Sequence, residues 1–185
     1  EAINEIWLRM DRLLEGSTAA ERSPAIYAEV LDGVARFHGI SVSTMMRGEA
    51  FGFYLLGTCA ERADMTARLL DVKYHLLLPD VSMVGSPLDY YQWAAILRSV
   101  SALRGYHFLY RDRVQPWLVA ELLMLRPEMP RSLATCLNEI TAHLELLAGA
   151  YGAHGECHRL AGQMHAALRY GKIEPASGGR SRQKV

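Results

Sequence analysis

The sequence has no net charge and no long apolar run. Its 185 residues include 20 Lys and Arg against 20 Asp and Glu, so no overall field attracts the chain to nucleic acid or to an anionic membrane. No segment approaches the ~18 to 20 apolar residues that a membrane span requires. The first residues, Glu1 to Glu5, lack the charged-then-apolar layout of a signal peptide. These absences predict a cytoplasmic protein that binds neither nucleic acid nor a membrane.

Cysteine is also scarce. The three cysteines, at positions 59, 136 and 157, are odd in number, far apart and never in a Cys-x-x-Cys pair. This pattern indicates neither a disulfide framework nor a structural zinc site. Cys59 falls on the apolar face of a predicted helix, where a buried thiol is inert.

Three common catalytic and nucleotide-binding signatures are missing. The chain has no Gly-x-Ser-x-Gly, no Walker loop and no Gly-x-Gly-x-x-Gly, so it shows neither a serine nucleophile nor a phosphate cradle. We therefore predict no cofactor in this chain. If the function uses ATP, we expect a partner to bind it.

Helical periodicity is what the sequence does contain. No alternating β-branched run competes with apolar residues spaced three and four apart. The pattern, with Ser23-Pro24 and Ser86-Pro87 as start signals, predicts helices over about residues 3–14, 24–38, 45–78, 87–110, 117–125, 131–150 and 156–168. We predict an all-α, multi-helix bundle built around one long central helix. It forms one domain over residues 1–174, and residues 175–185, which have little to bury, form a flexible basic tail.

The most informative pattern is a polar stripe within residues 57–78. At about 100° per residue, the stripe residues share an arc of roughly 80°; they are Gly57, Glu61, Asp64, Arg68, Asp71 and His75. Apolar residues border this arc on both sides, whereas a solvated helix face is normally broad. We therefore expect the helix to lie deep in the bundle, with its charges facing one another or a cavity.

Two interpretations of the stripe stay open. In the first, neighbouring carboxylates raise the pKa of at least one of them, and Arg68 orients a substrate carboxylate or stabilises an anion. In the second, an intramolecular salt-bridge network fixes helix register without a ligand. Arg62 points away from the stripe, and we expect it to bridge to another helix. The candidate catalytic residues are Glu61, Arg62, Asp64, Arg68, Asp71 and His75.

A metal site is the rival explanation for acidic residues on a long helix. A di-metal carboxylate bundle needs Glu-x-x-His on two helices, a spacing that this chain lacks. Asp71 and His75 are spaced to share one ion, and His154, His158 and His165 form the densest ligand-type cluster. We interpret the first two as a pair at a helix end and the others as surface histidines, and we predict no metal ligands.

Several separated motifs resemble the bacterial alpha-E domain family, which is named for a helical Glu-Arg motif. In the family's order, they are Glu61 to Leu78, Gln92-Trp93, Leu97-Arg98-Ser99, Ser101-Ala102-Leu103 and Pro130-Arg131-Ser132. The resemblance, which extends from about Glu1 to Glu174, implies a cytosolic helical protein. Relatives are encoded beside, or fused to, a circularly permuted ATP-grasp ligase-like protein and a transglutaminase-like cysteine peptidase. The resemblance therefore implies a component of a peptide- or amide-bond-forming, peptide-modifying system with those two proteins as partners.

The chain departs from the family at both ends. It lacks an earlier helix related to residues 57–78 and abandons the helix that the family continues after residue 174. We expect a missing helix to leave apolar surface uncovered, and hence self-association or a stable partner. Two functions follow: a substrate-handling site on the stripe, or a non-catalytic helical interaction module. Whether the chain is an enzyme is left open by its residues.

Overall fold

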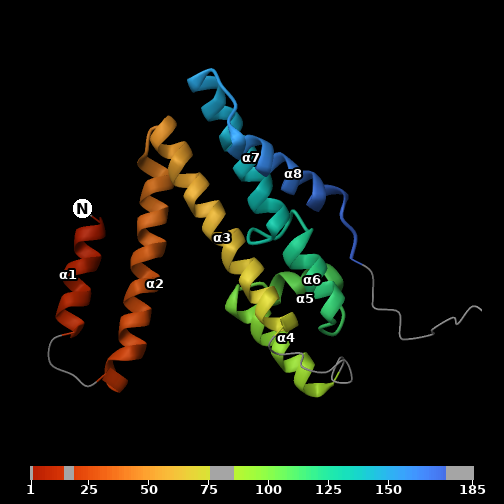
Figure 1. The fold of residues 1–185 in the computed structure, drawn as a ribbon. Helices are drawn as coiled ribbons and strands as arrows, with labels where there is room; N and C mark the ends of the chain where they lie inside the picture. The colour runs from red at the N-terminus through yellow and green to blue at the C-terminus, as the bar shows by residue number, and fades with distance from the viewer. Residues whose placement is uncertain (1, 15–18, 76–85, 174–185) are drawn as a thin grey trace, which may run out of the picture. The chain divides into compact units, whose positions relative to one another are not determined.

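The computed structural model describes residues 2–14, 19–75 and 86–173 (Figure 1). These ranges contain eight helices and no strand. The helices are α1 (Ala2–Leu14), α2 (Ala19–Thr44), α3 (Glu49–His75), α4 (Pro87–Ser99), α5 (Leu103–Tyr110), α6 (Pro116–Met124), α7 (Leu133–Tyr151) and α8 (Glu156–Tyr170). The predicted all-α bundle around one long central helix, α3, is confirmed. No helix of the described residues combines the length and apolarity needed to cross a membrane, and the predicted tail lies outside the described ranges.

The boundary between the second and third helices differs from the prediction. Helix α2 begins before Pro24 and continues through Gly39 to Thr44, and α3 begins at Glu49 rather than Met45. Residues 41–44 offer several hydroxyls as caps for α3, but Thr44 Oγ1 donates to the Ile40 carbonyl at 2.8 Å inside α2. These residues therefore extend the preceding helix.

The predicted helix over residues 87–110 is two helices. Ser101 adopts a left-handed φ of 58°, which ends α4 and turns the chain into α5. The Ala102 amide donates to the Leu97 carbonyl at 2.7 Å across this turn. No glycine or proline marks the break in the sequence, so periodicity alone runs through it.

The chain divides into two compact units, Glu1–Phe51 and Gly52–Val185. In the first unit, α1 packs along α2. The helices approach closely at Gly33, where a Cβ would lie 2.7 Å from Ile6 Cγ1. Two ion pairs flank this contact, Arg9–Glu29 at 3.3 Å and Arg36–Glu5 at 3.1 Å.

The second unit has a continuous apolar core between α3, α4, α5 and α6. Its fully buried side chains include Trp93, Leu97, Tyr106, Val119, Leu122 and Leu123. Helix α7 is capped by Ser132, whose Oγ accepts from the Thr135 amide at 3.1 Å. Thr66 on α3 donates to the Arg131 carbonyl at 2.8 Å. The Pro130-Arg131-Ser132 motif thus starts α7 and ties it to α3.

Candidate functional site

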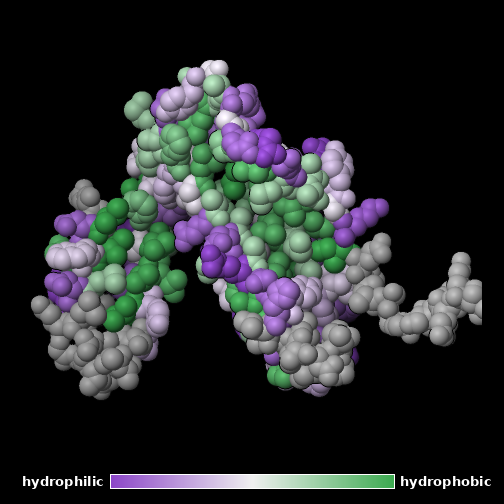
Figure 2. Space-filling view, viewed as in Figure 1, coloured by the Kyte–Doolittle hydropathy of each residue, from purple (hydrophilic) through white to green (hydrophobic). Residues whose placement is uncertain are grey.

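The polar stripe of α3 lies on the surface of the second unit. Glu61, Asp64, Arg68, Asp71 and His75 are all exposed, and Figure 2 shows a hydrophilic band along this helix. Even the flanking Met65 and Val72 are 48% and 41% exposed. The expectation that apolar surface encloses the stripe is therefore wrong within this unit. A different line of residues on α3 faces the core.

The charged stripe residues pair along the helix and not across an interface. Arg68 Nε donates to Asp64 Oδ2 at 2.7 Å, and this bond raises the pKa of Arg68. His75 Nε2 lies 3.3 Å from Asp71 Oδ1. Pairs this exposed contribute little to stability. Glu61 forms no hydrogen bond or ion pair within the described parts of the chain, so its carboxylate is open to a binding partner.

Arg62, the second residue of the Glu-Arg pair, is half-buried on α3. Its positive charge lowers the pKa of both Cys59 on α3 and Cys136 on α7. Burial is the larger effect at both thiols and raises their pKa values overall. The prediction of a buried Cys59 is confirmed. A bridge from Arg62 to another helix is absent in the described ranges, since its guanidinium has no ion-pair partner there.

A buried ion pair on the core side of α3 was missed by the sequence analysis. Lys73 Nζ lies 2.7 Å from Asp89 Oδ1, and the two side chains are 0% and 2% exposed. Lys73 also donates to Gln92 Oε1 at 2.6 Å and lies 5.3 Å from the centre of the Trp93 ring. Two motifs of the family resemblance, residues 61–78 and Gln92-Trp93, therefore meet at this lysine.

The signal for Lys73 is present in the sequence. The buried line of α3 consists of Cys59, Thr66, Leu70 and Lys73, and steps of seven, four and three residues keep one helix face. A lysine on such a line needs a buried counter-charge. Asp89, in the first turn of a helix with Ser86 as its cap, supplies it.

An apolar groove borders the stripe. It has a volume of about 600 Å³ and lies between α3, α7 and α8. Asp64 stands at its edge beside Ala60, Ala63 and Ala67, and Leu137 and Met164 line the other helices. Small residues on α3 leave this space open. A charged row beside an apolar groove is the arrangement of a polar rim next to a hydrophobic contact surface.

The histidines near α8 are engaged in local contacts. His158 Nδ1 accepts from the Gly155 amide at 3.0 Å, while its Nε2 lies 3.0 Å from the Leu144 carbonyl. His154 pairs with Glu145 at 2.9 Å. Over the described residues, no three His, Cys, Asp or Glu side chains are grouped to hold a metal ion.

Comparison with models of protein families gives a match. The model of the Alpha-E family, described as a predicted alpha-helical domain with a conserved ER motif, matches residues 1–182. No curated protein and no solved structure matches the chain. In α3 the Glu-Arg pair at positions 61 and 62 presents one exposed and one half-buried side chain. With a match over nearly its whole length, the chain belongs to the Alpha-E family.

Proposed function

We propose that the chain is the docking component of a peptide- or amide-bond-forming system and that α3 binds an ATP-grasp-type partner. The observation that carries this proposal is the exposed charged row from Glu61 to His75 beside the apolar groove. A partner helix or loop laid into the groove would bury its apolar walls and meet the charges at the rim. The transglutaminase-like protein is a further partner by family resemblance.

The exposure of the stripe favours docking over chemistry at a secluded site. Catalytic electrostatics gain strength where water is excluded, and the side chains of Asp71 and His75 are 70% and 76% exposed. Charges at an open surface instead steer association and select the partner. ATP, in this proposal, is bound by the partner.

A substrate-handling site is the second candidate, and one observation favours it. The Glu61 carboxylate has no ion-pair or hydrogen-bond partner in the described part of the chain, while its neighbours Asp64 and Arg68 are paired. An unpaired carboxylate is able to accept a proton or hold a substrate amine. Under this second function, the proposed catalytic residues are Glu61, Arg62, Asp64, Arg68, Asp71 and His75.

Binding and turnover separate the two functions. The chain would be titrated with an ATP-grasp-type protein of the kind proposed as its partner, and peptide modification would be followed in the same mixture. If α3 docks the partner, Glu61→Gln and Arg68→Gln weaken the complex by about tenfold or more. If the stripe handles substrate, the complex forms normally and turnover falls.

The control is Arg159→Gln on α8, because Arg159 is an exposed arginine paired with Glu156 on its own helix. This variant should bind and turn over like the parent chain. Circular dichroism of each variant establishes that the fold is kept. If both stripe variants leave binding and peptide modification unchanged, the stripe has no part in the function.

We also propose self-association through the first unit. Tyr27, Leu31 and Val34 follow one face of α2 and are 68%, 71% and 59% exposed. Figure 2 shows hydrophobic surface over this part of the chain, and exposed apolar patches mark interaction sites. Leu31→Glu should lower the mass found by light scattering, while the neighbouring Asp32→Asn should not. A parent chain that stays monomeric over a wide concentration range contradicts this proposal.

A further inference from the structure

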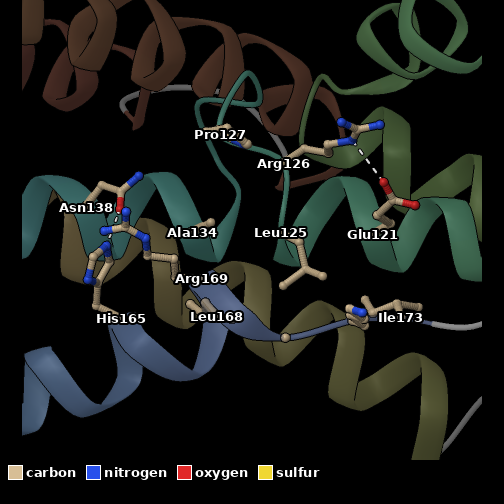
Figure 3. A pocket seen from close by; sticks show the side chains of 12 residues that line it. Glu121, Leu125, Arg126, Pro127, Ala134, Asn138, His165, Leu168, Arg169 and Ile173 are labelled. Carbon is tan, nitrogen blue, oxygen red and sulfur yellow. Dashed lines mark hydrogen bonds and ion pairs between the residues drawn. The ribbon is translucent and has the colours of Figure 1, made fainter.

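A second hollow of the Gly52–Val185 unit lies where α8 ends. It has a volume of about 680 Å³ and is formed by the end of α6, the α6–α7 connection, the start of α7 and the residues that follow α8 (Figure 3). It is distinct from the groove beside the stripe, because Leu168 is the one lining residue that the two hollows have in common. Neither the family match nor the proposed function assigns a role to it.

Two cations at this pocket have no counter-charge among the residues that the structure describes. Arg126 is neutralised, because its Nε lies 3.0 Å from Glu121 Oε1 and 3.4 Å from the Tyr110 hydroxyl. Arg169 and Lys172 also line the pocket. Within residues 2–14, 19–75 and 86–173, neither makes an ion pair or a side-chain hydrogen bond. The pocket therefore has an excess of positive charge.

The polar end of the pocket also offers a neutral donor. His165 Nε2 lies 2.6 Å from Asn138 Oδ1. With Oδ1 accepting from the imidazole, the Asn138 side-chain amide keeps its N–H groups for a ligand. Figure 3 shows Arg169 reaching toward this end, so a guanidinium and an amide donor lie near each other. An arginine fork and an amide together suit the oxygens of a planar carboxylate.

The rest of the pocket wall is apolar. Leu125, Leu168 and Ile173 line it. Figure 3 shows Leu125 and Leu168 between the end with Asn138 and His165 and the end with Glu121 and Arg126. Gly171 allows the chain to pass here, because a Cβ at this position would lie 2.8 Å from the Ala167 carbonyl oxygen and 3.6 Å from Leu125. The glycine thus brings Lys172 and Ile173 onto the wall.

We propose that this pocket binds a monocarboxylate with a short aliphatic group, its carboxylate at Arg169 and the Asn138 amide and its aliphatic group against Leu125 and Leu168. A phosphate would use the cations and leave the apolar wall exposed to water, whereas an aliphatic carboxylate uses both. The C-terminal residue of a peptide and a free branched-chain acid share this chemistry.

Calorimetric titration of the full chain tests the proposal without any partner protein, so it is independent of the docking function. The probes are N-acetyl-leucine as a peptide end, 4-methylpentanoate as a free acid, N-acetyl-leucinamide and inorganic phosphate. We expect saturable binding of N-acetyl-leucine and none of the amide, which lacks the charge. Equal affinity for 4-methylpentanoate assigns the site to free acids, and weaker affinity assigns it to peptide ends.

Variants locate the site. Arg169→Gln removes an exposed cation and should weaken N-acetyl-leucine binding by about tenfold, the scale of a lost charged contact. Arg159→Gln, on the same helix but outside the pocket, should bind like the parent chain. The proposal is overturned by the absence of saturable binding, by equal binding of the amide, by unchanged affinity in Arg169→Gln, or by equally tight binding of phosphate.

Discussion

Lys73 Nζ lies 2.7 Å from Asp89 Oδ1 in the core of the second unit, with both side chains removed from solvent. This ion pair joins the end of α3 to the first turn of α4. Removing two charges from water is costly, and the pair persists because Gln92 Oε1 and the Trp93 ring also contact the ammonium group. The pair therefore fixes the contact of α3 with α4, whereas the exposed stripe on the opposite face contributes little to it.

Breaking this pair on one side should destabilise the fold strongly. Lys73→Met leaves the Asp89 carboxylate buried without its cation, and we expect a loss of about 3–5 kcal/mol in the free energy of unfolding. Urea unfolding followed by circular dichroism measures this loss. The exposed pair provides the control, because Arg68→Gln should leave the midpoint unchanged.

The double variant Lys73→Met/Asp89→Leu separates the buried charge from the lost packing. Replacing both partners by apolar residues removes the uncompensated carboxylate, so most of the stability lost in Lys73→Met should return. If the double variant is as unstable as Lys73→Met alone, the lysine acts through packing against Trp93 and not through its charge.

Gly33 and Gly39 in α2 should respond oppositely to alanine. A Cβ at Gly33 would lie 2.7 Å from Ile6 Cγ1. At Gly39, no atom of the described residues beyond the nearby backbone of α2 lies within 4 Å of such a Cβ. Gly33→Ala should therefore cost about 1–3 kcal/mol by overpacking the α1–α2 contact. Gly39→Ala should gain about 0.5–1 kcal/mol, because alanine favours the helix. Thermal unfolding of the two variants checks the signs, and stabilisation in both would contradict the close approach of α1.

The three thiols should differ in reactivity. Cys59 and Cys136 are buried and Cys157 is exposed, and burial raises the pKa of the first two thiols. Because the thiolate is the reactive form, a thiol reagent at neutral pH should modify one cysteine quickly and the other two only on unfolding. Cys157→Ser should remove the fast phase. Two fast thiols in the parent chain would show that α3 and α7 separate readily.

The fold was more predictable from the sequence than the site was. Apolar spacing and capping residues report local structure, so α6, α7 and α8 lie within two residues of their predicted bounds. The turn at Ser101 has no such local signal, because its left-handed φ is imposed by the packing of α4 on α5. The same limit applies to the joint between α2 and α3, where Ser, Thr and Gly residues were compatible with either helix.

The stripe shows why burial could not be derived from one helix. Its narrow polar arc is real, yet Ala60, Ala63 and Ala67 beside it line an open groove instead of a packed interface. Small apolar residues allow close packing without requiring it. Lys73, by contrast, lies on the buried face of α3, seven residues after Thr66. The buried charge of α3 is therefore outside the stripe. Arg169 lies near Asn138 only through the packing of α8 on α7.

Alkaline pH should weaken the folded state through two tyrosines, the partly exposed Tyr74 and the buried Tyr106. Burial raises the pKa of Tyr74, with the Asp89 charge as a smaller cause, and burial likewise raises that of Tyr106. The unfolded chain releases these protons near pH 10, while the folded chain retains them. Above that pH the folded state therefore binds more protons than the unfolded state, and the free energy of unfolding falls as pH rises toward the folded pKa values.

The variant Tyr74→Phe isolates one of these groups. It keeps the ring that meets Trp93 edge-on at 5.7 Å between centroids and removes the titrating hydroxyl. Urea midpoints measured from pH 8 to 11 should then fall less steeply than in the parent chain. Tyr170→Phe, at a residue that is 77% exposed, is the control variant for the loss of a hydroxyl. Equal slopes in all three proteins would mean that Tyr74 titrates alike in the folded and unfolded chain, which would place its hydroxyl in water and away from Asp89.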